Sequence, residues 1–383
     1  MTRSLRSFVQ PIPFVAASLA AAMLAVASAT VKAQTITDQR WNRTDDGRNF
    51  TMSVRGKVWF TEDDRDIERI EPDGRVMIEE KLRGQPGRMI ILTPASNGEL
   101  QRVYLLDGQP HAYDTDAQNW LAGVLPAIVR ESGAGAVERA RRIYSKKGAT
   151  GVLDEIEQIN SNSTRRIYLT TLIEGWKLSP SDAARALRAT GGMSSNSEKA
   201  ALLLGASNRV DMSDALVRGA YMDAARTISS GSELRRVLTK LLDTQSLPEQ
   251  TLIDALRTSS EISSNPERAA VLAQAAERHK LSSGELRSAF FNSADGISSN
   301  SEKRRVLVTL LRAQGTDREI VRAVVKSARG ITSDSDKAAV LLEVPPLALK
   351  DPSTVEVYRD TMDTIRSRAT RESVAARVGG SWI

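Results

Sequence analysis

One stretch of the chain, residues 297–307, recurs six times with small changes, and this repetition constrains the fold more than any other feature. Successive copies are 34 or 35 positions apart. A fixed period in this range is typical of an α-solenoid, in which each helix pair buries its apolar face only against its neighbours. We therefore predict a right-handed α-solenoid over 159–344. Each copy opens with an apolar anchor residue two places before a serine: Ile159, Met193, Ile228, Ile262, Ile297 and Ile331, with Ile365 as a possible seventh at the next such interval.

Each copy also carries the residues that begin a helix. In the copy at Ile297, Ser299 can cap the first turn while Glu302, three residues later, reaches back to the free amide. The same pairing recurs as Ser195 with Glu198, Ser230 with Glu233, Ser264 with Glu267 and Ser333 with Asp336. A second set of caps predicts where the second helix of a repeat begins: Ser179, Ser246, Ser282 and Thr316.

The alternation of the two spacings indicates that the true period is two copies long, as from Ile228 to Ile297. We call this longer period the double repeat. The copies at Ile228 and Ile297 share Arg-Arg-Val-Leu, whereas the intervening copies have Ala-Ala at the matching positions. Tyr221 and Phe290 are separated by one double repeat and occupy corresponding second helices. We infer a four-helix block duplicated in tandem, with broad and narrow layers alternating along the stack.

The region before the repeats has a different pattern, in which apolar and polar residues alternate from about 41 to 116. Turn dipeptides such as Asp73-Gly74 and Asp107-Gly108 separate the runs. This predicts an antiparallel meander of five or six strands, packed against a helix from about 119 to 131. With 117–158 as a helical bridge, the fold class is α+β, mainly α.

The end of the chain departs from the repeat. Pro345 and Pro346 stop the first helix of the last full copy, and Pro352 begins another that we expect to run to about Arg368. A frayed tail is expected from Thr370. Residues 345–383 therefore read as a C-terminal capping helix and tail.

Residues 1–33 read as a secretory signal peptide. Arg3 and Arg6 precede an apolar run at 14–31 and small residues suited to cleavage after Ala33 or Ala29. The mature chain is expected in the periplasm or outside the cell, without stable membrane insertion. A permanent N-terminal membrane anchor is the alternative. The chain has no cysteine, which excludes disulfides and a lipoprotein anchor.

The charge balance argues against a nucleic-acid partner. The formal net charge is +6, and loss of Arg3, Arg6 and Lys32 with the signal peptide would lower it to +3. Lys and Arg do not cluster with stacking aromatic residues, as a nucleic-acid-binding surface requires.

A basic residue recurs at the sixth place after most anchors, with Leu234 interrupting the column. It could line a groove for an acidic peptide or an anionic envelope polymer. Alternatively, these residues form solvated ion pairs that contribute little stability. Candidate partner-binding residues are the column and its neighbours, together with the two aromatic residues: Arg165, Lys199, Arg235, Arg236, Arg268, Lys303, Arg304, Arg305, Lys337, Tyr221 and Phe290.

No catalytic, cofactor or metal motif is present in the sequence, so no such residue is predicted. His111 lies near Asp114 and Asp116, but the spacing matches no metal framework and a polar turn is expected. A second acidic group, Glu62, Asp63, Asp64 and Asp66, lacks the rhythm of a calcium loop and is expected to be an exposed turn.

The repeat core Ile-Ser-Ser-Asn-Ser-Glu-Lys-Arg-Arg-Val-Leu resembles helical repeats of extracytoplasmic bacterial proteins, including those attached to BlaR-type sensor metallopeptidases. Residues 41–125, with Asp66-Ile67-Glu68-Arg69-Ile70 and Trp120-Leu121, are similar to the β region that accompanies those repeats. The zinc protease signature and the membrane helices of that family are missing. The resemblance implies an envelope-located sensing or interaction domain and carries over no catalytic residue.

These observations lead to one functional expectation. The chain is expected to be a non-enzymatic periplasmic scaffold or sensor-type domain that binds a protein or peptide of the cell envelope through its solenoid surface. Two alternatives stay open. One is a regulator or hydrolase of the envelope with its site in the β domain around His111, and the other is a binder of anionic envelope polymers.

Overall fold

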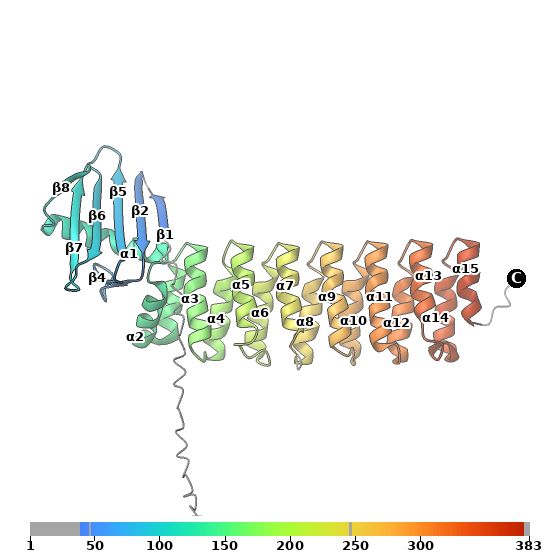
Figure 1. Ribbon diagram of the computed structural model, residues 1–383. Coiled ribbons are helices and arrows are strands. Elements are labelled where there is room, and N and C mark those ends of the chain that lie inside the picture. Colours follow the sequence, from blue (N-terminus) through green and yellow to red (C-terminus); the bar gives the residue numbers. More distant parts are fainter. Residues whose placement is uncertain (1–38, 46, 245–246, 379–383) are drawn as a thin grey trace, which may run out of the picture. The chain divides into compact units, whose positions relative to one another are not determined.

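The computed structural model describes residues 39–45, 47–244 and 247–378, so the expected signal peptide lies outside the described residues. Strands come first and helices follow (Figure 1). The predicted fold class, a small antiparallel sheet followed by a mainly helical part, is confirmed. The strands are β1 (Gln39–Asp45), β2 (Arg48–Arg55), β3 (Val58–Phe60), β4 (Ile67–Ile70), β5 (Arg75–Leu82), β6 (Arg88–Pro94), β7 (Leu100–Leu106) and β8 (Gln109–His111).

Six strands form one antiparallel sheet in the order β1-β2-β5-β6-β7-β8, and β3 with β4 forms a separate hairpin between β2 and β5. The predicted turns are present. Asp73 and Asp107 have φ angles of 63° and 47°, which Asp tolerates better than most residues. The predicted count of five or six strands is too low, because β4 and β8 are too short to show an alternating pattern.

One face of the sheet packs against helix α1 (Thr115–Ser132), as predicted. Ile78 and Ile90, which are paired across β5 and β6, are completely buried with Leu121 and Leu125 of the helix. Buried Glu80 accepts a 2.6 Å hydrogen bond from the Trp120 ring nitrogen, so the polar atom of this large side chain is satisfied within the core.

The remaining helices form two rows (Figure 1). From α3 onward, odd-numbered helices pack on odd-numbered neighbours and even-numbered helices on even-numbered neighbours. The predicted helix pairs are therefore present, and the right-handed sense of a solenoid stays a prediction. The helices are α2 (Ala136–Glu157), α3 (Asn162–Gly175), α4 (Pro180–Gly191), α5 (Asn196–Ala206), α6 (Ala215–Arg226), α7 (Gly231–Leu242), α8 (Glu249–Ser259), α9 (Asn265–Arg278), α10 (Gly284–Asp295), α11 (Asn300–Gln314), α12 (Arg318–Ala328), α13 (Asp334–Glu343), α14 (Pro352–Met362) and α15 (Arg368–Ala375), with short 3-10 turns η1 (Ala348–Lys350) and η2 (Ala376–Val378).

The serines of the repeat motif begin the odd-numbered helices as predicted. Ser195, Ser230, Ser299 and Ser333 each accept a hydrogen bond from the amide three residues later. Ser264 occupies the same place before α9, but its side chain accepts no such bond.

Two of the predicted second caps lie one residue too early. The caps are Ser283 and Asp317, not Ser282 and Thr316, because only these side chains reach the free amides of the first turn. Ser179 is confirmed as the cap of α4, and Ser246 lies outside the described residues.

The asparagine of the motif joins each repeat to the next. Asn265, the first residue of α9, accepts a 3.1 Å hydrogen bond from the Ser298 amide and donates a 3.0 Å bond to the Ser298 hydroxyl. We call this recurring contact the asparagine ladder. Gly231 stands at the ladder position of α7 and has no side chain to make it. The other asparagine pairs are Asn162 with Ser194, Asn196 with Ser229 and Asn300 with Thr332, and Asp334 accepts from the amides of Arg366 and Ser367.

Ion pairs between repeats follow the predicted double repeat. Arg304 binds Asp336 of the next odd-numbered helix at 3.0 Å, and Arg235 binds Glu267 in the same way. Arg166 with Glu198 is the third member of the series. The intervening repeats have alanine at the arginine position, so every second layer lacks this bridge.

The even-numbered row shows the same alternation. α4 packs closely on α6, α8 on α10 and α12 on α14, whereas α2 and α4, α6 and α8, and α10 and α12 pack more loosely. Small residues permit the close layers: a Cβ on Gly191 would lie 3.3 Å from Cα of Ala224. Ser259 and Ser293, both buried, share a 2.7 Å hydrogen bond between α8 and α10. An alternation of close and loose layers is therefore present in the even-numbered row.

The C-terminal prediction of one capping helix to about Arg368 is wrong, because α14 ends at Met362 and α15 follows. Ile365 is completely buried and acts as a seventh anchor, and Ser367 caps α15 by accepting from the Thr370 amide. The expected frayed tail from Thr370 is also wrong, since helical structure continues to Val378.

Buried tyrosines link helices within a repeat. The Tyr358 hydroxyl of α14 lies 3.3 Å from the Leu341 carbonyl oxygen and 3.4 Å from that of Val374, and it shares its one hydrogen between them. Burial raises the pKa of the Tyr358 hydroxyl from 10.0 to about 12. Tyr221 is fully buried and donates to the Leu203 carbonyl at 3.0 Å, and burial raises its pKa as well.

Restoring the missing ladder contact should stabilise the protein. Replacing Gly231 by Asn should raise the free energy of unfolding by about 1 kcal/mol, because the new amide can bind Ser263 across the layer. A Cβ at this position meets only Ile262 at 3.4 Å and Ser264 at 3.8 Å, so the side chain fits. Gly231→Ala is the control for helix propensity alone. Urea unfolding in which Asn stabilises no more than Ala would contradict the ladder contribution.

Tyr358 should make stability fall at alkaline pH. The folded-state pKa is raised, so its contribution is complete below pH 10 and is lost as the pH rises from 10 to about 12. Tyr358→Phe should cost about 1 kcal/mol at neutral pH through its lost hydrogen bonds. The stabilities of wild type and variant should then converge above pH 10. Urea unfolding across this pH range that gives parallel curves would refute the assignment.

Candidate functional site

The loop between β3 and β4 meets helix α2 at the boundary between two hydrophobic cores. One core contains the sheet and α1, and the other runs from α2 to α15. Gly135, with φ of 62°, begins α2 directly against the Phe60 ring, where a Cβ would lie only 2.9 Å from the ring. A glycine is therefore required at the crossing between the cores.

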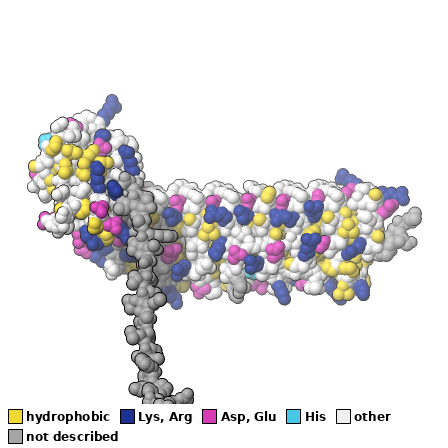
Figure 2. Space-filling model, in the orientation of Figure 1, with side chains coloured by type: hydrophobic (Ala, Val, Ile, Leu, Met, Phe, Trp, Pro, Cys, Tyr) yellow, Lys and Arg dark blue, Asp and Glu magenta, His cyan; other side chains and the backbone are white. Residues whose placement is uncertain are grey.

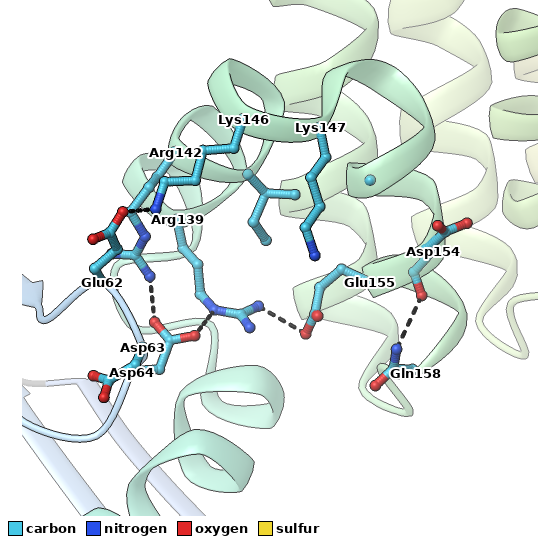
Figure 3. Close-up of a pocket in the computed structure, with 12 residues that line it drawn as sticks. Glu62, Asp63, Asp64, Arg139, Arg142, Lys146, Lys147, Asp154, Glu155 and Gln158 are labelled. Atoms are coloured by element: carbon cyan, nitrogen blue, oxygen red, sulfur yellow. Dashed lines mark hydrogen bonds and ion pairs between the residues drawn. The ribbon is translucent and has the colours of Figure 1, made fainter.

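A buried arginine fastens this junction. Arg139 of α2 donates to Asp64 at 2.6 Å and to Glu155 at 2.8 Å (Figure 3). It also donates to the Tyr168 hydroxyl at 2.7 Å. These partners come from the β3–β4 loop, from a later turn of α2 and from α3. We call these four residues the junction network. The guanidinium of Arg139 has its donors directed at three separate elements, as the rigid fork of arginine allows.

Two further arginines complete the charge balance. Arg142 binds the other oxygen of Asp64 and donates to the Phe60 carbonyl at 3.2 Å, and Arg130 of α1 binds Glu155 at 2.7 Å. Asp64 has a φ angle of 59°, in the left-handed region that costs a non-glycine residue energy. The arginine contacts hold this backbone conformation in place.

The network shifts the titration of its members. Burial alone would raise the pKa of the Glu155 carboxyl, but hydrogen bonds and positive charge from Arg139 and Arg130 lower the pKa below its ordinary value. Burial also raises the pKa of the Tyr168 hydroxyl. Glu155 is thus held ionised and Tyr168 neutral at physiological pH.

A cavity of about 330 Å³ lies beside the network and is lined largely by charged side chains. Lys147 and Asp154 of α2 extend along it (Figure 3). The kink of α2 at Gly148, with φ of 64° and ψ of −163°, turns the second half of the helix so that Glu155 reaches back toward Arg139. The arrangement joins the sheet to the helices.

The acidic group that could have bound calcium is explained by these contacts. Asp64 is buried between arginines, Asp66 binds Arg102 at 3.0 Å, and Glu62 pairs with Lys146. Asp63 accepts from the Thr61 hydroxyl at 2.8 Å, which lowers the pKa of its carboxyl. The expectation of an exposed turn is wrong for Asp64, which is buried because α2 covers the loop.

The residues near His111 have structural contacts. His111 is exposed in the short edge strand β8, and Asp114 caps α1 by accepting from the Ala117 amide at 3.1 Å. Asp116 lies 3.4 Å from Arg88. In the ranges that the structure describes, no group of three or more potential metal ligands is arranged to hold an ion.

The basic column is largely buried. Lys199, Lys303 and Lys337 are only 4–6% exposed, so the expectation that they line an accessible edge or stay solvated is wrong. They satisfy groups at the ends of second helices, where a cation is favourable. The contacts are Lys199 with the Thr227 carbonyl, Lys303 with Asp295, Lys337 with Thr364, Arg268 with the Ser260 and Ile262 carbonyls, and Arg165 with the Ile159 carbonyl.

The other candidate residues divide into two groups. Tyr221 and Phe290 are completely buried, which corrects their proposal as contact residues. The neighbouring arginines are partly exposed, and each forms an ion pair on the surface. The pairs are Arg235 with Glu267, Arg236 with Glu233, Arg304 with Asp336 and Arg305 with Glu302. On the visible face of the stack, basic and acidic side chains are interspersed (Figure 2).

The structure reveals a groove that the sequence analysis missed. It has a volume of about 820 Å³ and lies between α10 and α12, which belong to one of the loosely packed layers. The half-buried ring of Phe291 lines it, next to the buried Phe290. A comparison of residues separated by one double repeat would have indicated this location, since the groove lies where the two copies of the block differ.

A second exposed feature is the face of the sheet opposite α1. Met77, Ile91 and Val103 are paired across β5, β6 and β7 on this face, and Val103 is 47% exposed. Hydrophobic side chains gather over the sheet in Figure 2. Among the described residues, no other element buries these side chains fully.

Comparison with known proteins gives no match: no family model, no curated protein and no solved structure matches the chain. Among the helices of the described residues, none has the length and apolar character needed to cross a membrane.

Removing the central arginine of the junction network should destabilise the protein strongly. Arg139→Met leaves Asp64 and Glu155 buried with fewer cations, and should cost roughly 3 kcal/mol or more in free energy of unfolding. Arg185→Met is the matched control, because Arg185 forms surface ion pairs with Asp154 and Glu157 between α2 and α4. The control should cost less than about 1 kcal/mol.

Acid titration provides a second readout of the same variant. The lowered pKa of Glu155 means that its contribution is present above pH 4.5 and is lost as the pH falls through the folded-state value. Arg139→Met should show a weaker acid dependence in urea unfolding. Equal stability losses for Arg139→Met and Arg185→Met would show that the junction network is not a stabilising element.

Proposed function

We propose that this protein is a non-enzymatic periplasmic scaffold or sensor-type protein that binds a protein or peptide partner through the surface of its helical stack. The observation that supports this most is that the conserved and the variable positions of the repeat have different structural roles. Its recurring polar residues are used to cap helices and to join neighbouring layers, as Asn265 does with Ser298. The surface positions that differ between layers are then available for recognition.

The junction network supports a role in which the sheet and the helices act together. Arg139 of α2 binds Asp64 of the β3–β4 loop and Glu155 of α2. These charged contacts hold the loop on the helix. Such a contact is more sensitive to a change in packing than an apolar interface, because a displaced buried charge is costly. A partner bound to one part could therefore affect the other, as a sensor-type domain requires.

The proposed compartment is the periplasm or the extracellular space, with cleavage after Ala33 or Ala29. The basis is the charged, apolar and small-residue order of positions 1–33. The resemblance to the segments of BlaR-type sensor metallopeptidases points to the same compartment. It supplies the idea of an envelope sensor domain but no catalytic role.

The alternatives have less support. The hypothesis that the protein binds an anionic polymer was based on an exposed basic column. Lys199, Lys303 and Lys337 of that column are buried. An envelope hydrolase or regulator with a site near His111 relied on Asp114 and Asp116, whose contacts with α1 and Arg88 account for them structurally.

A capture experiment tests the proposed function. The full chain, immobilised and exposed to periplasmic extract under mild cross-linking, should recover a small set of proteins in repeated experiments. Addition of the free chain as competitor should abolish the recovery, which serves as the specificity control. Recovery of nothing beyond a bait-free support would contradict a scaffold or sensor role.

A further inference from the structure

The groove between α10 and α12 differs from the equivalent layer one block earlier. Helices α10 and α12 match α6 and α8 in length and spacing, exactly one double repeat later, so every position has a counterpart. Arg287 of α10 corresponds to Arg218 of α6. Both are held by the loop that precedes their helix: Arg287 donates to the Leu281 and Ser282 carbonyls at 3.1 and 2.9 Å, and Arg218 to those of Met212 and Ser213 at 3.5 and 3.3 Å.

The two arginines differ in what faces them. Arg218 also binds Asp254 of α8 at 3.3 Å, and this ion pair bridges the layer. The counterpart of Asp254 in α12 is Ala323, which lines the groove. In the first block the same position is Arg185, which bridges α4 to Asp154 and Glu157 of α2. Of these three loosely packed layers, the α10–α12 layer is thus the one whose bridging position carries no charge.

The groove consequently has positive charge that the described residues do not balance. No carboxylate among them lies within ion-pair distance of Arg287 or of Lys326, which also lines the groove. Lys303 is neutralised by Asp295 at 2.9 Å, and Glu319 by Arg322. The loop carbonyls keep Arg287 in a fixed position, so a carboxylate could bind it without reordering the side chain.

We propose that this groove is a docking site for an extended segment of a partner protein, in which an acidic side chain takes the place that Asp254 has in the preceding block. The inference rests on the proposed function and names the chemistry of the partner. An apolar residue next to the acidic one would pack on Phe291, which is half-buried, whereas its counterpart Met222 is fully buried. The volume of about 820 Å³ is larger than one carboxylate side chain requires, which favours a segment of several residues.

Selection from a displayed library of random peptides tests the proposal on the full chain. Peptides that bind the wild type should be enriched in Asp or Glu beside an apolar residue. Replacing the acidic residue of a selected peptide by its amide should weaken binding about tenfold or more, because a charge-assisted hydrogen bond is lost. Raising the salt concentration should weaken the same peptides.

Variants of the chain locate the site. Arg287→Gln should reduce binding about tenfold, and Ala323→Asp should do the same by supplying an internal carboxylate to Arg287. Arg218→Gln is the matched control, because it changes the equivalent arginine in the bridged layer and should leave binding unchanged. Ala323→Asp should not reduce stability in urea unfolding, so that a loss of binding is separated from a loss of folding.

The outcomes separate this inference from the proposed function. Selected peptides that bind equally to wild type, Arg287→Gln and Ala323→Asp would overturn the groove assignment while leaving a scaffold role intact. Competition by free acetate or glutamate at the concentration of the peptides would show a small-carboxylate site and would also overturn it. A failure to select any peptide would overturn it too. If the capture experiment then recovered no partner, the proposed function would fail as well.

Discussion

A hydrogen bond between the asparagine of one repeat and the serine or threonine of the next recurs along the stack, except at α7, where Gly231 stands in its place. Asn300 makes the same contact with a threonine: it accepts from the Thr332 amide and donates to the Thr332 hydroxyl, which fixes the register between adjacent helix pairs. Each contact contributes only about 1 kcal/mol. In a repeat protein these nearest-neighbour terms add along the chain, so their regular recurrence stabilises the whole stack. The apolar anchors then bury themselves in the same register.

A consequence of this arrangement is that polar residues common to all repeats are mostly unavailable to a partner. The lysines of the basic column neutralise helix ends, and the acids of the first turns bind arginines across alternate layers. Under the proposed function, a partner would be recognised at positions where the layers differ. Ala323 is such a position, because the equivalent Asp254 and Arg185 both form ion pairs across their layers. The same logic applies to the junction network, which joins the sheet to the first helices and has no counterpart in the repeat motif.

Much of the fold is predictable because its signals are local. Ser299 and Glu302 mark a helix start within one turn, and alternating residues mark the strand β5. The site is less predictable. The motif suggests a capping role for Glu302, but its carboxylate binds Arg305 at 2.6 Å. The spacing suggests a surface position for Lys303, although the end of α10 buries it. Ile365 is recognisable as a further anchor, yet the helix that follows it escapes prediction because the pattern after Pro352 favours one longer helix.

Helix capping, turn formation and apolar periodicity act over a few neighbouring residues, and they are sufficient to specify the helix pairs, the double repeat and the antiparallel strands. The burial of charges and the groove between α10 and α12 depend instead on contacts between segments that are far apart in the chain. Arg139 binds Asp64 across 75 residues of sequence, and the groove at Ala323 exists only because two helices face each other. These features follow from how the layers pack, and no local pattern specifies them.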